Sequence, residues 1–245
     1  MRETNYKESD KILTVLTRDL GKKTVKARGC RRKNSKLTPS CQLLVYSEMT
    51  IFERGEFLTM QEAAPAEQFW GVRQDITLLS LASYFAELCE VCAEEGLPHP
   101  EILSLLLNSL YALDRLRKPP ALVKPAFELR LMGLVGYEPL LEGCAVCATA
   151  DPEDPCLHLR NGVMHCARCR DGAGEGVSMP LTPGALQAMR HIVWGEAGRL
   201  FSFTLDPHSL TLLGDASEAF LQTQLERGFR TLDYYKQMTY SMKEY

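Results

Sequence analysis

Two cysteine pairs in the second half of the chain have the spacing of metal ligands. Cys144 and Cys147 form one CxxC motif, Cys166 and Cys169 form another, and 18 residues separate the two motifs. Each CxxC turn can place two sulfurs on one side of a tetrahedral ion, so the pairs together predict a four-thiolate Zn²⁺ site. Four thiolates leave no coordination position for a reacting water, so we expect the zinc to be structural.

The sequence leaves some alternatives open for these thiols. Three residues between the pairs are possible substitute ligands: Cys156, His158 and His165. Cys89 and Cys92 form a third CxxC, but both fall in the middle of a predicted amphipathic helix, which favours a place in the core over redox chemistry. A thiol redox enzyme that uses this pair is the alternative, and it would require an exposed thiol with a low pKa.

No motif in the sequence indicates an enzyme. The chain has no GxxxxGK[ST], GxGxxG, HExxH or GxSxG motif, and its five histidines are scattered. No window approaches the roughly 20 apolar residues of a membrane helix, and the first residues lack the apolar run of a signal peptide. The nine cysteines are then reduced thiols or metal ligands. We expect a binding protein of the cytoplasm, without catalytic residues and without a membrane partner.

A dense run of cations near the front of the chain suggests a polyanionic partner. The segment from Lys22 to Lys36 contains eight Lys or Arg residues and no acid. Residues 1–40 carry 12 basic and 4 acidic side chains, whereas the remaining residues carry 16 and 27. This asymmetry favours a basic front module that meets nucleic acid, and the alternative is a solvated flexible loop. The expected DNA-binding residues are Lys22, Lys23, Lys26, Arg28, Gly29, Arg31, Arg32, Lys33 and Lys36.

The basic run lies among short segments that read as strands. Residues 11–17, 22–28, 42–53 and 56–63 are rich in β-branched or aromatic residues, and turn signals separate them. Four or five strands in 65 residues suggest a small antiparallel barrel of the oligonucleotide-binding (OB) kind. Nearby aromatic residues would then either stack on bases or fill the core; they are Tyr6, Tyr46, Phe52 and Phe57.

From Ala66 onward the pattern is helical. We expect helices at residues 76–95, from Pro100, at 122–135, at 182–194 and at 207–229, and a tail from Thr231 that is loosely packed or disordered. The first three should form a bundle. The sequence thus predicts an α+β protein, with an OB-like domain at residues 1–65 and a helical domain at 66–245 that carries a zinc finger at 144–169.

Several residue patterns together resemble one known family. The front reads Tyr6-x-Glu8-x-Asp10-Lys11-x-Leu13-Thr14-x-x-Thr17, and continues with Gly21-Lys22 and Ala27-Arg28-Gly29-x-Arg31, then Ser35 and Leu37. The later part has Arg73-x-Asp75, Tyr84-x-x-Glu87, Phe127-Glu128-Leu129-Arg130-Leu131 and Gly136-Tyr137-x-Pro139 just before the first CxxC. Over nearly the whole chain this combination resembles the RecO family of bacterial recombination mediators.

The resemblance implies a role in recombinational DNA repair. It implies binding of single- and double-stranded DNA, annealing of complementary strands, and help to RecA in replacing single-strand-binding protein, together with RecR, at the nucleoid. It also implies that the helical domain receives the acidic tail of single-strand-binding protein, for which the candidate residues are Arg115, Arg117, Lys118, Lys124 and Arg130. Each of these five cations has the alternative of being a solvated helix charge.

One departure from the family and one rival class remain. Members of the family usually carry a further strand before the residues that match Arg2–Tyr6. Either the natural start lies upstream of Met1, or the barrel lacks its first strand and leaves a neighbouring strand unpaired at an edge. The rival class is a zinc-ribbon protein that binds RNA or a ribosome through the same basic front.

Overall fold

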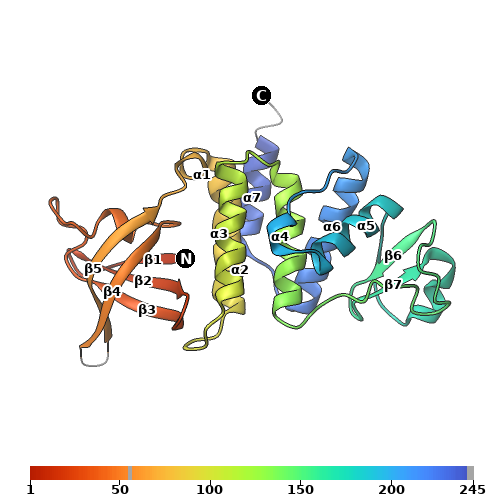
Figure 1. Cartoon of the computed structure of the whole chain (residues 1–245), viewed down its shortest axis with the longest axis horizontal. Helices are drawn as coiled ribbons and strands as arrows, with labels where there is room; N and C mark the ends of the chain where they lie inside the picture. Colours follow the sequence, from red (N-terminus) through yellow and green to blue (C-terminus); the bar gives the residue numbers. More distant parts are fainter. Residues whose placement is uncertain (55–56, 242–245) are drawn as a thin grey trace. The chain divides into compact units, whose positions relative to one another are not determined.

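The chain divides into two compact units in the computed structural model, which describes residues 1–54 and 57–241. Unit 1 combines Met1–Leu116 with the segment from Phe229 onward, and unit 2 is Arg117–Gly228. Figure 1 labels most of the helices and strands of both units. None of the helices in the described ranges is both long enough and apolar enough to cross a membrane.

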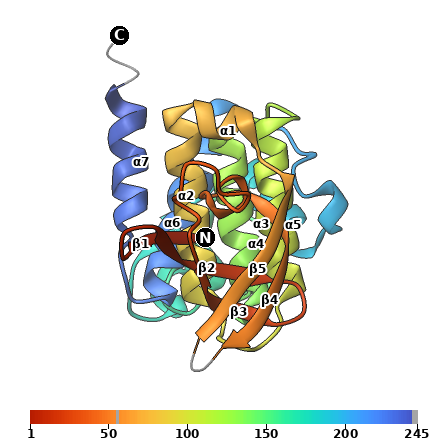
Figure 2. The same cartoon turned by 90° about the vertical axis from the view of Figure 1, so that its left-hand side faces the viewer.

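Unit 1 begins with a five-stranded sheet that curls into an open barrel (Figure 2). The strands are β1 (Arg2–Tyr6), β2 (Asp10–Thr17), β3 (Gly21–Ala27), β4 (Tyr46–Arg54) and β5 (Phe57–Glu67). Their order is β1-β2-β3-β5-β4, with antiparallel pairing except for a short parallel contact between β3 and β5. In the hairpin of β4 and β5, two register shifts mark irregularities of the kind that strengthen the twist of a sheet. The predicted α+β class with a front β-domain is confirmed.

Buried apolar residues alternate with more exposed residues along β2 and β3, and the buried ones form the core of the sheet. Leu13 on β2 pairs with Val25 on β3, and Val25 and Ala27 have no exposed surface. Cys30, Cys41 and Met60 complete the buried cluster. Because neighbouring residues on a strand point to opposite faces, Lys26 lies on the face away from this core.

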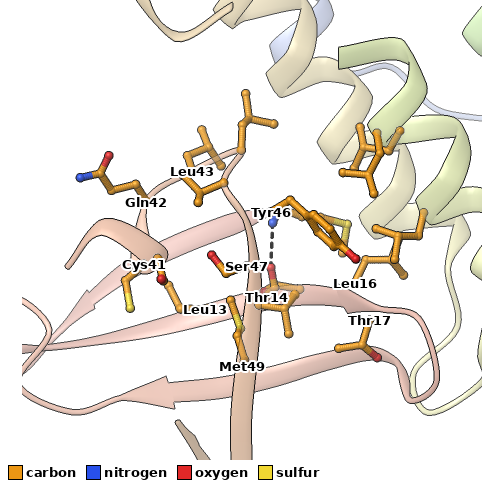
Figure 3. Close-up of a pocket in the computed structure, with 18 of the residues that line it drawn as sticks. Leu13, Thr14, Leu16, Thr17, Cys41, Gln42, Leu43, Tyr46, Ser47 and Met49 are labelled. Atoms are coloured by element: carbon orange, nitrogen blue, oxygen red, sulfur yellow. Dashed lines mark hydrogen bonds between the residues drawn. The ribbon is translucent and has the colours of Figure 1, made fainter. Parts of the chain in front are cut away.

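The barrel is not closed, and its opening forms a cavity of about 450 Å³. β1 and β4 are the two edges of the sheet, with no pairing between them among the described residues. Figure 3 shows Leu13, Thr14 and Leu16 of β2 together with Tyr46 and Met49 of β4 around this space. Leucines of the helix α3, described below, line the cavity as well.

Four helices complete unit 1. They are α1 (Trp70–Gln74), α2 (Ile76–Cys92), α3 (Pro100–Asp114) and α7 (Arg230–Ser241). Asp75 begins α2, since its carboxylate accepts hydrogen bonds from the backbone N–H groups of Thr77 and Leu78 at 2.8 and 3.0 Å. Cys89 is fully buried in α2, in agreement with the core position expected from the sequence.

The tail differs from the expectation of loose packing. Residues 230–241 form α7, which packs against α2. The hydroxyl of Thr231 donates a hydrogen bond to the carboxylate of Glu87, and the rings of Tyr84 and Phe229 meet edge to face at 5.7 Å. Leu232 and Tyr235, three residues apart, are both buried on this helix. The helix expected at residues 207–229, which precedes α7, ends earlier than predicted, at Gln224. Two residues later, Glu226 has a left-handed conformation with φ 51°.

Unit 2 contains three helices and a small sheet. The helices are α4 (Pro120–Leu134), α5 (Pro183–Trp194) and α6 (Pro207–Gln224), and the strands are β6 (Pro155–His158), β7 (Val163–Cys166) and β8 (Ser178–Pro180). The strand order is β7-β6-β8. The expected three-helix bundle is thus divided, because α4 packs with α5 and α6 and belongs to unit 2.

A buried ionic cluster joins α4 to α6. The ammonium of Lys124 lies 2.8 Å from the Glu128 carboxylate and 2.9 Å from that of Glu218, and the hydroxyl of Ser217 donates to Glu128 at 2.6 Å. Burial opposes the charge on Lys124, but the two carboxylates outweigh it and raise its pKa. Lys124 therefore stays charged inside the unit.

Replacing Ser217 with alanine should weaken this cluster. Glu128 has no exposed surface, so it would lose a charge-assisted hydrogen bond that water cannot easily replace. We expect urea unfolding of the full chain to show a loss of about 1.5 kcal/mol in the free energy of unfolding. Thr223→Ala is the control, since the Thr223 hydroxyl lies on the exposed side of α6 and bonds its own helix backbone. Equal effects of the two substitutions would contradict the prediction.

Candidate nucleic-acid interface and metal centre

Three of the predicted DNA-binding lysines lie on β3, and two of them already have partners in unit 1. The ammonium of Lys22 donates to the backbone carbonyl of Glu90 at 2.6 Å, in the last turn of α2, where the helix dipole favours a cation. Lys26 lies 3.5 Å from the carboxylate of Asp10. Lys23 points to the opposite face from these two, because residues alternate along the strand. The strand therefore offers less free charge than its sequence suggests.

The loop after β3 holds the exposed part of the basic segment. Five of its cations are exposed and form no ion pair with another described residue: Arg28, Arg31, Arg32, Lys33 and Lys36. Unpaired cations on one short stretch repel one another, so the loop would bind a polyanion favourably. These five are the best-placed of the predicted phosphate contacts.

The same loop is anchored at both ends. The carboxylate of Asp10 accepts a hydrogen bond from the backbone N–H of Gly29 at 2.8 Å, and the Ser9 carbonyl accepts one from Arg31 N–H at 3.0 Å. Cys30, between Gly29 and Arg31, is buried in the sheet core, and at the other end of the loop Cys41 is buried in the same core. The loop is thus attached to the sheet at both ends.

Asp10 is the anchor that the sequence patterns did not single out for this task. The hydrogen bond from Gly29 N–H, helped by Lys26, lowers the pKa of its carboxyl despite partial burial. Gly29 itself has φ 63°, a left-handed conformation that glycine adopts without strain. An acid at the start of a strand that pairs with a basic strand was the available signal, because the register, with Lys11 opposite Ala27, places Asp10 beside the end of β3.

The candidate cations for the partner tail fall into two groups. Lys124 is buried in the ionic cluster, and Arg130 donates a hydrogen bond to the backbone carbonyl of Gly195. The other three are more accessible. Arg115, in unit 1, lies 3.0 Å from Asp114 and 3.4 Å from Glu67, and Arg117 and Lys118 begin unit 2 without an ion pair to a described residue.

The four predicted zinc ligands meet in unit 2. Their sulfur atoms all lie within 4.8 Å of one another, and those of Cys147 and Cys166 are 3.6 Å apart. A tetrahedral zinc with Zn–S bonds of about 2.3 Å requires sulfurs about 3.8 Å apart, so the cluster has the size of such a site. The four residues come from a turn before β6 (Cys144 and Cys147), from the end of β7 (Cys166) and from the 3₁₀ segment after it (Cys169).

Local hydrogen bonds shape the first of these turns. Ala148 N–H donates to the Cys144 carbonyl at 2.8 Å, and Cys144 N–H donates to the Thr149 carbonyl at 2.8 Å. Ala145 N–H then ties the turn to the carbonyl of Met164 in β7 at 2.9 Å. These bonds bring the two cysteine pairs together, because β7, which carries Cys166, is also hydrogen-bonded to the turn that carries Cys144 and Cys147.

The closeness of the four sulfurs shifts their pKa values in both directions. Hydrogen bonds from Thr149 lower the pKa of Cys147 to about 6, whereas burial and the neighbouring sulfurs raise that of Cys166 to about 12. Cys166 N–H also points at the Cys144 sulfur at 3.3 Å, as expected for a thiolate acceptor. Four thiolates at this spacing need a positive ion between them, so the residues present suit a structural metal ion such as Zn²⁺.

The other candidate ligands are not part of the four-sulfur cluster. His165 places one ring nitrogen 2.8 Å from the Cys166 carbonyl and the other 2.8 Å from the Ser178 hydroxyl. Nδ1 of His158 accepts a hydrogen bond from Asn161 N–H, whereas its buried Nε2 has no hydrogen-bond partner among the described residues. Cys156 lies outside the four-sulfur cluster. Cys89 is also unsuited to redox chemistry, because burial raises its pKa.

Fold and site together define an α+β protein whose β-domain presents a cationic loop and whose second unit carries a cluster of four cysteines that could hold a metal ion. Family models support a specific assignment. The model described as "Recombination protein O N terminal" matches residues 1–69, and that described as "Recombination protein O C terminal" matches residues 73–233. The chain belongs to the RecO family of DNA repair proteins, as the sequence patterns predicted.

Individual relatives agree with this assignment. The DNA repair protein RecO of Acetivibrio thermocellus is 29% identical over 236 residues, which cover 96% of this chain and 93% of the relative. That of Desulfitobacterium hafniense (strain Y51) is 29% identical over 233 residues, covering 94% and 85%. That of Listeria innocua is 32% identical over 171 residues, covering 70% and 66%. The similarity therefore extends over both units.

Proposed function

We propose that this chain is a DNA-binding recombination mediator that contacts phosphates through its basic loop. The observation that carries the proposal is the set of five exposed, unpaired cations on an anchored loop of an OB-like sheet. Contacts to phosphate carry no base information, so binding to single- and double-stranded DNA should be independent of sequence and should weaken with salt. OB folds bind oligonucleotides on the face of strands 2 and 3 and through neighbouring loops, which suits this position.

Strand annealing follows from the same charges. Two complementary strands repel each other through their phosphates, and a protein that neutralises both lowers this barrier. In the proposed role the protein acts on DNA coated by single-strand-binding protein and, together with RecR, helps RecA to take its place. The accessible cations Arg117 and Lys118 of unit 2 are the proposed contacts for the acidic tail of single-strand-binding protein, since Lys124 and Arg130 are engaged within the unit.

An annealing assay with coated strands tests this proposal. Complementary oligonucleotides are coated with single-strand-binding protein that either keeps or lacks its acidic tail, and duplex formation is followed with and without the full chain. We expect faster annealing on DNA, and a larger gain when the tail is present. No acceleration on any coated DNA would contradict the proposal. Stronger binding to RNA than to DNA of equal length, in direct competition, would favour the RNA-binding alternative.

A further inference from the structure

Tyr6 lies next to the anchored end of the basic loop. It is the last residue of β1, and it pairs in register with Asp10 of β2. Asp10 holds the N–H of Gly29, and Ser9 holds that of Arg31. The turn that follows Tyr6 is therefore bonded directly to the segment that carries the unpaired arginines.

The Tyr6 ring is accessible on the face of the sheet that points away from the core. Residues that pair in register share a face, so Tyr6 and Asp10 lie on the same side of the sheet as Lys26, which pairs with Ile12 two positions after Asp10. Tyr6 is 38% exposed, whereas Tyr84 in the helices of unit 1 is fully buried. Tyr6 therefore contributes little to the core, and core packing does not explain why an aromatic residue stands at this position.

Two ammonium groups flank this ring. The Nζ atom of Lys26 is 4.7 Å from the ring centroid and that of Lys7 is 5.6 Å from it, both within cation–π range. A nucleotide in a single strand offers a flat base and a phosphate on either side of it. An exposed ring with cations close to it, Lys7 in the turn after it and Lys26 two strands away on β3, matches both parts, because single-strand-binding surfaces combine aromatic stacking with backbone cations.

We infer that Tyr6 is a stacking platform for one base of a single-stranded nucleic acid, with Lys7 beside a flanking phosphate. This inference rests on the proposed function, because it adds a base contact to the phosphate contacts of the loop. It predicts that a residue outside the basic run gives the chain tighter binding to single strands than to duplex. A duplex, whose bases are already stacked on each other, gains nothing from Tyr6.

The test separates the stacking contribution to affinity from the electrostatic one by varying the salt concentration and by removing the bases from the oligomer. Tyr6→Leu and Tyr6→Phe are compared for binding to oligo-dT and to an abasic oligomer of the same length, each from 0.05 to 1 M salt. Loss of one base stack should weaken oligo-dT binding by Tyr6→Leu about 5- to 150-fold at every salt concentration, with the salt slope unchanged. Tyr6→Phe should bind like wild type, and the abasic oligomer should not distinguish the three proteins.

A matched control and a second measurement make the outcome decisive. Tyr111→Leu removes a half-exposed tyrosine from α3 and should change neither affinity nor slope. An oligonucleotide with one 5-iodouracil should crosslink to Tyr6 on irradiation. An equal loss on the abasic oligomer, or oligo-dT binding that is salt-dependent but insensitive to Tyr6→Leu, would overturn the stacking role alone. Absence of any wild-type binding would overturn the proposed function and this inference with it.

Discussion

Single-stranded DNA binding should lose its strong salt dependence when Arg28, Arg31 and Arg32 are all replaced by alanine. Each phosphate contact on a single strand contributes about 0.7 to the slope of log affinity against log salt. Three lost contacts should therefore reduce the slope by about 2, so that the affinity difference between variant and wild type is about 100-fold larger at 0.1 M than at 1 M salt. Fluorescence anisotropy with a labelled oligonucleotide across this range measures both quantities.

The control for this variant removes the same charge elsewhere. Arg160, Arg199 and Arg230 are also exposed, but they lie in unit 2 or on α7, away from the basic loop in the chain. Their replacement by alanine changes the net charge equally and should leave the slope close to that of wild type. If both triple variants reduce the slope by the same amount, net charge and not the loop governs binding, and the proposed interface is wrong.

Zinc binding should be lost when Cys144 is replaced by serine. Cys144 is buried and its sulfur accepts a backbone N–H, so a hydroxyl at this position removes one thiolate from a closed shell of four. Removal of an outer-shell partner alone costs metal sites about 10- to 100-fold in affinity, and loss of a ligand should cost more. Native mass spectrometry should show one zinc per wild-type chain and none in the variant at the same free zinc concentration.

The loss should also unfold the finger locally. Its three short strands have a small core, and binding free energy of a structural zinc is folding free energy. Limited proteolysis should therefore cut the variant between residues 140 and 181 while unit 1 stays resistant. Cys156→Ser is the matched control, because this thiol lies on β6 outside the cluster, and it should keep its zinc. A full zinc complement in Cys144→Ser would rule out the assigned ligand set.

Features set by residues close together in the chain were predictable from the sequence. The CxxC turns depend on a few neighbouring residues, and their spacing was enough to predict that four sulfurs would meet. Helix starts were similarly local, as with Asp75 before α2 and Pro100 at the start of α3. The strand pattern around Leu13 and Val25 follows from simple alternation.

Features that depend on distant partners were not predictable in this way. In the sequence, Lys124 has the pattern of a solvated helix charge. In the structure it is buried and forms an ion pair with Glu218, which lies far away in the chain. Leu232 and Tyr235 have helical spacing, but the packing of α7 against α2 depends on a segment far away in the chain, so the ordered tail was missed. The three finger strands have only four, four and three residues, too few to show a period. To predict that the loop arginines lack an ion pair, one also had to know that Asp10 pairs with Lys26 and not with an arginine.

The return of the chain to unit 1 through α7 bears on synthesis at the ribosome. Unit 2 is continuous from Arg117 to Gly228, so all of its residues are synthesised before those of α7. Unit 1 needs α7 against α2 for its complete packing, with Thr231 bonded to Glu87. During translation, α2 of unit 1 therefore stays without its α7 contacts until α7 has been made, whereas unit 2 does not include α7 and can complete its packing without it.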